Sequence, residues 1–164
     1  MRPPYPPFPM ENRDGGFDAV GLSVHHRVYG DGRITKCEGG TLVVAFGEKS
    51  LIFAYPWCVE GWSMSFADGE KQAWIRALVE SEEAKIYREA RRGRSGFDSD
   101  PIEDTAPYRR VAQRAEAEAR ERAGKGGYMG YCHRYWGEKC RVLLEKYGIV
   151  WHSPSAMNPH VMFD

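Results

Sequence analysis

The stretch from Val24 to Gly61 constrains the fold more than any other part of the chain. It holds four short runs of alternating or β-branched residues, at 24–28, 33–37, 41–46 and 50–55. Each run has the length and composition of a strand. Glycine-containing turns separate the runs, and Gly39-Gly40 suits the primed turns that join antiparallel strands. Pro56 ends the last run because proline cannot donate to a sheet ladder. This arrangement predicts a small antiparallel β-barrel.

A sequence pattern runs through the same stretch: valine, histidine, an aromatic residue, two glycines and an aliphatic residue, then a hairpin, a lysine and a proline. Its residues are Val24, His26, Tyr29, Gly30, Gly32, Ile34, Val43, Phe46, Lys49, Phe53 and Pro56. The pattern resembles the Tudor-like module at the C-terminus of some bacterial DNA-repair helicases. It is also similar to SH3-like modules of transcription-coupled proteins. The resemblance extends over residues 20–61 and implies a module that binds a protein, typically RNA polymerase, and that also touches nucleic acid.

The rest of the chain divides around this module. Residues 1–16 are rich in proline and then glycine, which favours a disordered or polyproline-II arm, although the proline–tyrosine run could also dock in an aromatic groove. Residues 17–66 form the predicted barrel. Residues 67–164 are predicted to be helical, with a linker at 93–104 and a docked C-terminal tail. The expected fold class is α+β: a small N-terminal SH3/Tudor-like barrel followed by about three α-helices.

Three helices are predicted in the C-terminal region, over 68–92, 105–123 and 128–147. Asp68 and Thr105 are N-cap residues, and Gly148 suits the left-handed position after a helix. The second helix has a narrow stripe of small residues, which predicts exposure, close packing through alanine or ordering on a partner. The third helix carries an apolar stripe, so a structural subunit that assembles through this stripe remains an alternative.

Charge and aromatic residues suggest where a partner would bind. Lys and Arg number 23, as do Asp and Glu, which argues against a protein that binds nucleic acid by bulk phosphate neutralisation. The arginines at 88, 91, 92 and 94 lie close together, either as a solvated helix face or as a patch for phosphate or an acidic partner. Tyr55, Trp57 and Trp62 lie near a proline turn and are either core residues or a surface patch. The predicted partner-binding residues are Tyr55, Trp57, Trp62, Arg88, Arg91, Arg92 and Arg94.

No catalytic or metal-binding signature stands out. Cys132, His133, Cys140, His152 and His160 are suitable ligand types, but they lack the close pairing of common zinc modules. No G-x-S-x-G, H-E-x-x-H or P-loop motif is present. We therefore expect no metal, no cofactor and no enzymatic activity. A small enzyme that uses Cys58 or Cys132 is the alternative from another class.

These features together predict a non-catalytic binding protein of the bacterial or phage cytoplasm. Its partner would be a protein of a nucleic-acid-processing machine, such as a polymerase, helicase or nuclease effector, with possible contact to nucleic acid through the local basic patch. An inhibitor of a host defence effector, of the anti-CRISPR type, is the alternative within the binding class. The cysteines form no C-x-x-C pair and no apolar run approaches the ~20 residues of a membrane span. A reduced, cytoplasmic protein without a membrane partner is therefore expected, and the oligomeric state stays open.

Overall fold

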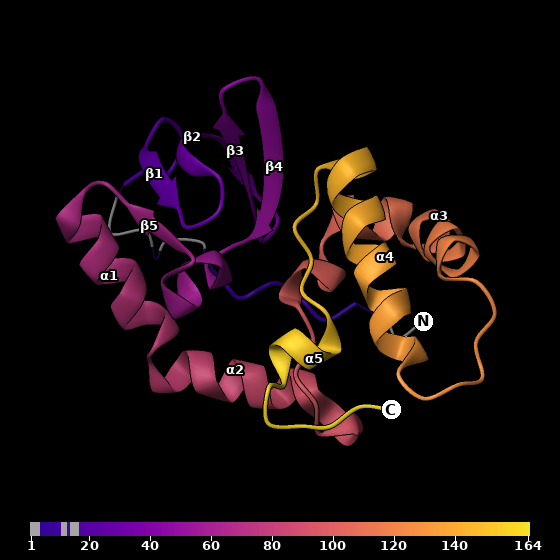
Figure 1. Ribbon diagram of the computed structural model, residues 1–164. Coiled ribbons are helices and arrows are strands. Elements are labelled where there is room, and N and C mark those ends of the chain that lie inside the picture. The colour runs from indigo at the N-terminus through magenta and orange to yellow at the C-terminus, as the bar shows by residue number, and fades with distance from the viewer. Residues whose placement is uncertain (1–3, 11–12, 14–16) are drawn as a thin grey trace.

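The computed structural model describes residues 4–10, 13 and 17–164. Its N-terminal half is an antiparallel sheet of five strands in the order β4-β3-β2-β1-β5 (Figure 1). The strands are β1 (Ser23–His26), β2 (Gly30–Glu38), β3 (Thr41–Phe46), β4 (Lys49–Ala54) and β5 (Met64–Phe66). A 3-10 helix, η1 (Trp57–Trp62), connects β4 to β5. The α+β class is confirmed. Closure into a barrel is not, since no ladder joins β4 to β5 within the described residues.

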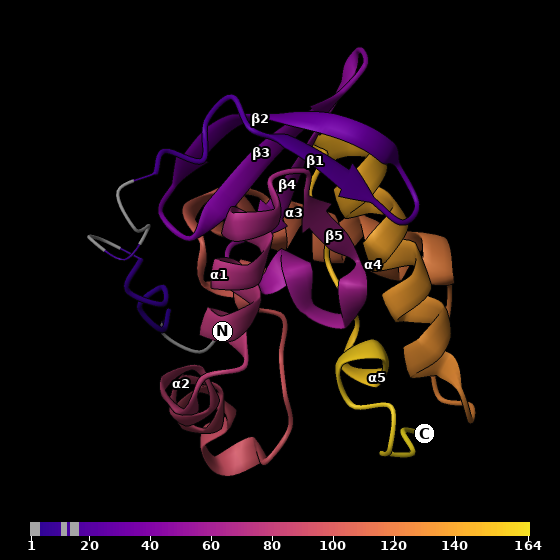
Figure 2. The ribbon, with the colours of Figure 1, turned by 90° about the vertical axis from the view of Figure 1, so that its left-hand side faces the viewer.

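The C-terminal half is helical. Its elements are α1 (Gly69–Val79), α2 (Glu82–Arg92), η2 (Gly93–Ser95), η3 (Pro101–Asp104), α3 (Ala106–Ala123), α4 (Tyr131–Tyr147) and α5 (Pro154–Met157). The paired helices α3 and α4 lie on the β4 side of the sheet, and α1 lies on the β1–β5 side (Figure 1). Both views place α2 and α5 below the sheet (Figures 1 and 2). No helix of the described chain is both long and apolar enough to cross a membrane.

The helix predicted over 68–92 is two helices. Asp68 caps α1 as expected, accepting hydrogen bonds from the backbone N–H groups of Glu70 and Lys71 at 3.0 Å. Ser81 then adopts an extended conformation and accepts a hydrogen bond from the N–H of Ala84. Serine competes for backbone hydrogen bonds in this way, which makes it a good N-cap and a poor interior helix residue. The chain therefore turns between α1 and α2.

Helices α3 and α4 pack closely through the predicted alanine stripe. The stripe is buried along its length: Tyr108, Ala112, Ala115, Ala119 and Ala123. Small side chains allow α4 to approach, and Lys139 of α4 is buried over the rings of Tyr108 and Trp151, with Glu116 as its ion-pair partner. At the end of α4, Gly148 is left-handed and the N–H of Ile149 donates to the carbonyl of Leu143. The left-handed helix end predicted at Gly148 is confirmed, and the N–H of Gly148 donates to the carbonyl of Leu144, which is the 5→1 bond of the αL motif.

The segment after α4 joins the helical half to the sheet. The N–H of Ile52 in β4 donates to the carbonyl of Gly148 at 2.7 Å, and the N–H of Val150 donates back to Ile52 at 3.0 Å. Ile52 and Ile149 thus form a parallel bridge on the outer edge of β4. At the opposite edge, the N–H of Phe66 in β5 donates to the side-chain carbonyl of Gln72. Buried residues of both halves belong to one hydrophobic cluster.

Two segments predicted to be loose are held against the fold. Residues 4–10 lie on the protein instead of forming a disordered arm, because Phe8 is buried and the N–H of Tyr5 donates to Asp104. The remainder of the predicted arm, residues 1–3, 11–12 and 14–16, lies outside the described residues. The predicted linker at 93–104 contains η2 and η3, and its Ile102 enters the core. Its backbone is therefore anchored in the structure.

Candidate functional site

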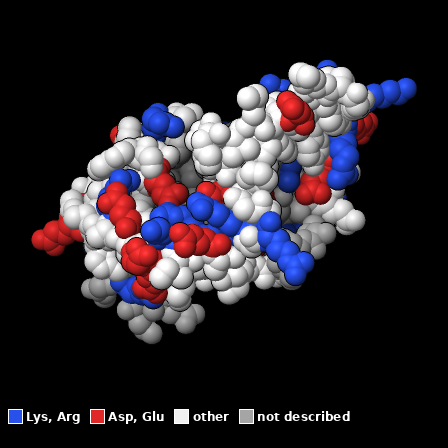
Figure 3. All heavy atoms as spheres, turned by 90° about the horizontal axis from the view of Figure 1, so that it is seen from below, with Lys and Arg blue, Asp and Glu red and all other residues white. Residues whose placement is uncertain are grey.

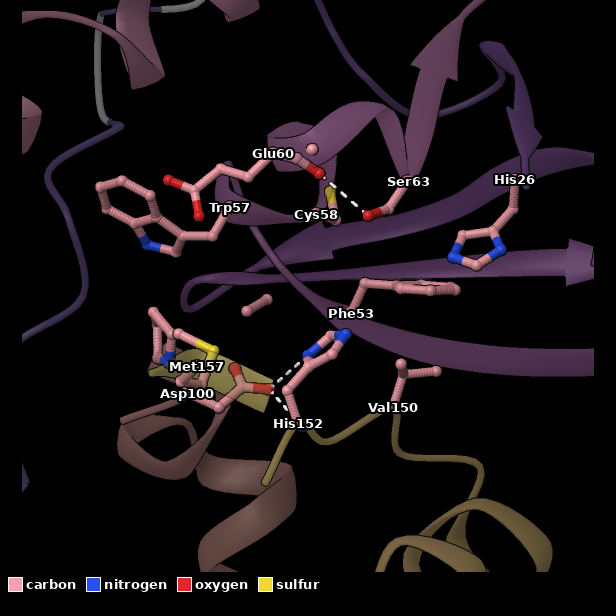
Figure 4. A pocket seen from close by; sticks show the side chains of 13 residues that line it. His26, Phe53, Trp57, Cys58, Glu60, Ser63, Asp100, Val150, His152 and Met157 are labelled. Atoms are coloured by element: carbon pink, nitrogen blue, oxygen red, sulfur yellow. Dashed lines mark hydrogen bonds and ion pairs between the residues drawn. The ribbon is translucent and has the colours of Figure 1, made fainter. Parts of the chain in front are cut away.

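A cavity of about 230 Å³ lies between the sheet, η1 and the C-terminal segment. Its walls are mostly apolar, with Phe53 and Trp57 on one side and Val150 and Met157 on the other (Figure 4). Several polar side chains also line it, namely His26, Cys58, Glu60, Ser63, Asp100 and His152. A preformed, largely apolar cavity with a few convergent polar groups is the usual form of a binding site.

His152 is fixed at the lower wall of this cavity by Asp100. The Nδ1 atom and the backbone N–H of His152 each lie 2.8 Å from Oδ2 of Asp100, whose other oxygen accepts from the N–H of Ile102. Asp100 is buried, and its hydrogen bond raises the pKa of His152. Because Nδ1 is the donor to this carboxylate, Nε2 of the neutral ring is left as an acceptor. In Figure 4 the imidazole extends from Asp100 towards Phe53.

His26 has the opposite tautomer. Its Nδ1 atom accepts from the N–H groups of Val28 and Tyr29, at 3.0 and 3.4 Å, so the neutral ring carries its proton on Nε2. The ring packs against Tyr29 and Phe53, with centroids 4.7 and 5.2 Å apart. Burial lowers the pKa of His26. The cavity thus combines a neutral imidazole with a hydrogen-bond donor and a second imidazole whose protonated form is favoured.

Two of the cysteines, Cys58 and Cys140, lie in surroundings that disfavour the thiolate. Burial raises the pKa of Cys58 to about 12, and burial also raises the pKa of Cys140. Nucleophilic cysteines and thiolate metal ligands need the opposite shift. Cys140 lies 3.5 Å from the carbonyl of Trp151, to which it donates, and His133 contacts the carbonyl of Phe163. Within the described part of the chain, no three His, Cys, Asp or Glu side chains are grouped so as to hold a metal ion.

The three predicted aromatic residues divide between core and surface. Tyr55 and Trp57 are 2% and 7% exposed, whereas Trp62 is 65% exposed. Trp62 has a positive φ of 60°, a conformation that is strained for a bulky side chain. The guanidinium of Arg76 lies 4.2 Å from the centre of the Trp62 ring and also donates to the carbonyl of Val59. Of the predicted aromatic patch, Trp62 alone is a surface residue.

The predicted arginine cluster is largely paired within the chain. Arg88 forms an ion pair with Glu60 and lies over the ring of Trp57. Arg91 is only 5% exposed and binds Asp104, with an N–O distance of 2.5 Å, while Arg92 binds Asp98 at 2.6 Å. Arg94 is exposed in η2, directly after α2. Basic and acidic side chains alternate on the face seen in Figure 3.

Sequence reasoning did not find the pair formed by Asp100 and His152. The two residues are 52 positions apart, and neither belongs to a motif with a fixed spacing. Two signals pointed in this direction: the apolar residues of the tail, which predict docking, and the Asp-Pro dipeptide at 100–101, which suits a turn. His26 was identified, but as a structural residue of the barrel pattern.

No protein-family model matches this sequence, and no match is found among the curated proteins or the solved structures compared with it.

Proposed function

We propose that this chain is a non-catalytic binding protein, built around an SH3/Tudor-like sheet, that docks on a protein of a nucleic-acid-processing machine. The observation that carries the proposal is the strand order. Four strands form a meander, a 3-10 helix follows, and the fifth strand returns to pair with β1. This is the order of an SH3-like barrel that is open between β4 and β5. Small barrels of this kind are typically binding modules.

The residues of the sequence pattern support the same assignment. His26, Tyr29, Phe46 and Phe53 form an aromatic cluster with centroid distances of 4.7 to 6.4 Å. A Cβ atom on Gly32 would lie 2.7 Å from Phe46, so a glycine is needed for this cluster to pack. The pattern therefore specifies how one end of the sheet is built.

The proposed docking surface is the η1 corner, which we define as Gly61, Trp62 and Arg76. An exposed tryptophan beside an arginine is the composition of an interface hot spot. The ring is held in one orientation by its contact with Arg76 and by its strained backbone, so little conformational entropy is lost on binding. Gly61 lines the cavity. A partner side chain can therefore enter the cavity beside Trp62.

A protein is favoured over nucleic acid as the direct contact. The formal net charge is zero, and Arg88, Arg91 and Arg92 are ion-paired within the chain. Binding to phosphates through this cluster would require breaking these pairs, and counterion release from its fourth member, Arg94, gives little affinity at physiological salt. Contact with DNA or RNA is accordingly assigned to the partner.

The test is affinity capture of partners with the tagged full chain, with and without nuclease treatment. We expect a polymerase, a helicase or a nuclease effector to be retained at near-stoichiometric amounts after nuclease. The variant Trp62→Ala should reduce this capture at least tenfold, the loss of about 1.4 kcal/mol or more that is typical of a hot spot. Tyr128→Ala, which truncates another exposed aromatic residue at 49% exposure, is the matched control and should retain capture.

Two outcomes would overturn the proposal. Loss of all partners on nuclease treatment would assign the binding to nucleic acid itself. Equal capture by the wild-type chain and by Trp62→Ala would remove the η1 corner as the docking surface. A host defence nuclease as the retained protein would select the inhibitor alternative within the same binding class.

A further inference from the structure

The proline-rich segment at residues 4–10 occupies an aromatic groove of its own chain. The groove, which we call the arm groove, is formed by Trp57 of η1, Tyr87 of α2 and Asp104 of η3, with Gly40 at its rim. In Figure 1 the indigo N-terminal segment runs below the sheet and above α2. The groove thus lies between the sheet and the helices and is built from elements far apart in sequence.

The floor of the arm groove is a pair of stacked rings. The rings of Trp57 and Tyr87 lie 5.5 Å apart with an interplanar angle of 12°. Phe8 places its edge against both, with centroid distances of 5.4 and 5.2 Å, and Tyr5 places its edge against Tyr87 at 5.4 Å. Edge-to-face packing of this kind is favourable beyond the area that it buries. Phe8 is 3% exposed and therefore acts as the anchor of the segment.

The backbone of the segment is also recognised. The hydroxyl of Tyr87 donates to the carbonyl of Pro6 at 2.7 Å, and the N–H of Tyr5 donates to Oδ1 of Asp104 at 3.0 Å. Arg91 holds the other carboxylate oxygen of Asp104 in place. A proline keeps its carbonyl acceptor although it lacks an N–H donor, so a groove can hold its backbone by placing a donor at this carbonyl. Tyr87 supplies that donor.

Pro7 approaches the rim of the groove closely at Gly40, where a residue with a side chain would crowd it. A Cβ atom on Gly40 would lie 3.0 Å from Cβ of Pro7. Proline segments are already extended, so they lose little conformational entropy when they dock in aromatic grooves. Ring packing, a donor for a proline carbonyl and this preorganisation together describe a recognition site.

We propose that the arm groove is a binding site for proline-rich segments with aromatic residues, and that residues 4–10 are its intrachain occupant. A partner protein with an exposed segment of this chemistry binds by displacing the arm. Every contact described above joins side chains or single backbone groups, so displacement breaks no helix and no strand. The proposal does not rest on docking at the η1 corner, because the two surfaces use different residues.

The attached arm competes with any segment added in solution. Because the arm belongs to the same chain, its effective concentration at the groove is of the order of 1 mM. An added peptide can bind only the fraction of grooves that the arm leaves empty, so its apparent affinity falls by that fraction. Weakening the arm should therefore strengthen binding of an added peptide. A segment that merely covers the core would show no such gain.

The probe is a labelled peptide of residues 1–10, MRPPYPPFPM, titrated against full-length protein and followed by fluorescence anisotropy. Tyr5→Ala combined with Phe8→Ala removes the three ring contacts between the arm and the groove and leaves the groove residues unchanged. We expect this double variant to bind the peptide at least tenfold more tightly than the wild-type chain. Adding Tyr87→Phe, which keeps the stacked ring but removes the hydroxyl donor, should reduce this affinity about fivefold, as expected for one hydrogen bond.

Three results would overturn the proposal. In the first, the peptide shows no saturable binding to a double variant whose circular dichroism is native. In the second, the peptide binds the double variant and the wild-type chain with equal affinity. In the third, a peptide in which alanine replaces Pro6 and Pro7 binds as tightly as the original peptide. The last would show that the groove does not select proline. If the double variant does not fold, Tyr5→Ala alone repeats the comparison, since Tyr5 is only half-buried.

Discussion

At the scale of single residues, two glycines of the α4 region face opposite constraints. Gly148 has φ of 63°, and a Cβ atom there would lie 2.8 Å from the carbonyl oxygen of Ser50. Gly137 lies inside α4 with open space around its Cα atom. Only the first of them is required by the structure, because a helix interior favours alanine over glycine.

The pair predicts stability changes of opposite sign. Gly148→Ala combines a left-handed alanine with a backbone clash and should lower the free energy of unfolding by about 2 kcal/mol. Gly137→Ala should raise it by about 0.5–1 kcal/mol. Urea denaturation of both variants measures the two values. Two changes of the same sign would contradict the conformation assigned to this region.

His152 predicts a pH dependence of stability. Its pKa is raised by the hydrogen bond with Asp100, so protonation favours the folded state. The stability that His152 contributes is fully present when the pH is below its ordinary pKa of about 6.5. This contribution is lost as the pH rises through the raised pKa of the folded state. His26, whose pKa is lowered, acts in the opposite direction, because its contribution is lost as the pH falls below about 6.5.

Comparison with His152→Gln isolates the contribution of His152, since this variant retains His26. The difference in unfolding free energy between wild type and variant should shrink as the pH is raised from 6 to 9. Urea denaturation at four pH values across this window measures it. A difference that grows with pH would mean that Asp100 does not raise the pKa of His152.

Residue-level prediction from sequence succeeded where local chemistry decides the outcome. Asp68 was identified as an N-cap and Gly148 as a helix-ending residue because both roles depend on the neighbouring backbone. The positions of Trp57 and Arg91 depend on segments distant in sequence: Phe8 covers the first and Asp104 pairs with the second. No local pattern contains that information, so both were assigned to a candidate surface.

At the scale of elements, the contact between α3 and α4 depends on residue size. Ala115 is fully buried in the alanine stripe, whereas Ala117 is exposed on the same helix. Ala115→Leu should lower the free energy of unfolding by about 1–3 kcal/mol, because a close-packed interface must be forced apart. Ala117→Leu is the control and should change it by less than about 0.5 kcal/mol. Equal effects in thermal or urea unfolding would show that the stripe is not an interface.

The strands and the two long C-terminal helices followed from sequence to within a few residues, since period and turn residues define them. The break between α1 and α2 was missed because one serine is compatible with a continuous helix, and only the path of α2 requires the turn. The cavity could not be predicted at all, because it forms where η1 meets η3 and the C-terminal segment.

At the scale of the whole molecule, the sheet and the helices unfold as one unit if their shared core sets stability. Buried residues of both halves form one cluster, and the bridge between Ile52 and Ile149 joins their backbones. Circular dichroism at 222 nm and tryptophan fluorescence should therefore give coincident urea transitions. An earlier transition confined to amides of β2–β4, detected by hydrogen exchange, would instead divide the chain into two independent units.

The same bridge limits the ways in which this protein can associate. An open sheet normally presents rows of unpaired N–H and carbonyl groups at its edges, which invite another chain to add a strand. Here the middle of β4 is hydrogen-bonded to the segment after α4, and β5 is three residues long, with one N–H taken by Gln72. Addition of a strand from another chain, whether in specific binding or in amyloid-like growth, is therefore obstructed at both edges of the sheet. Recognition must proceed through side chains.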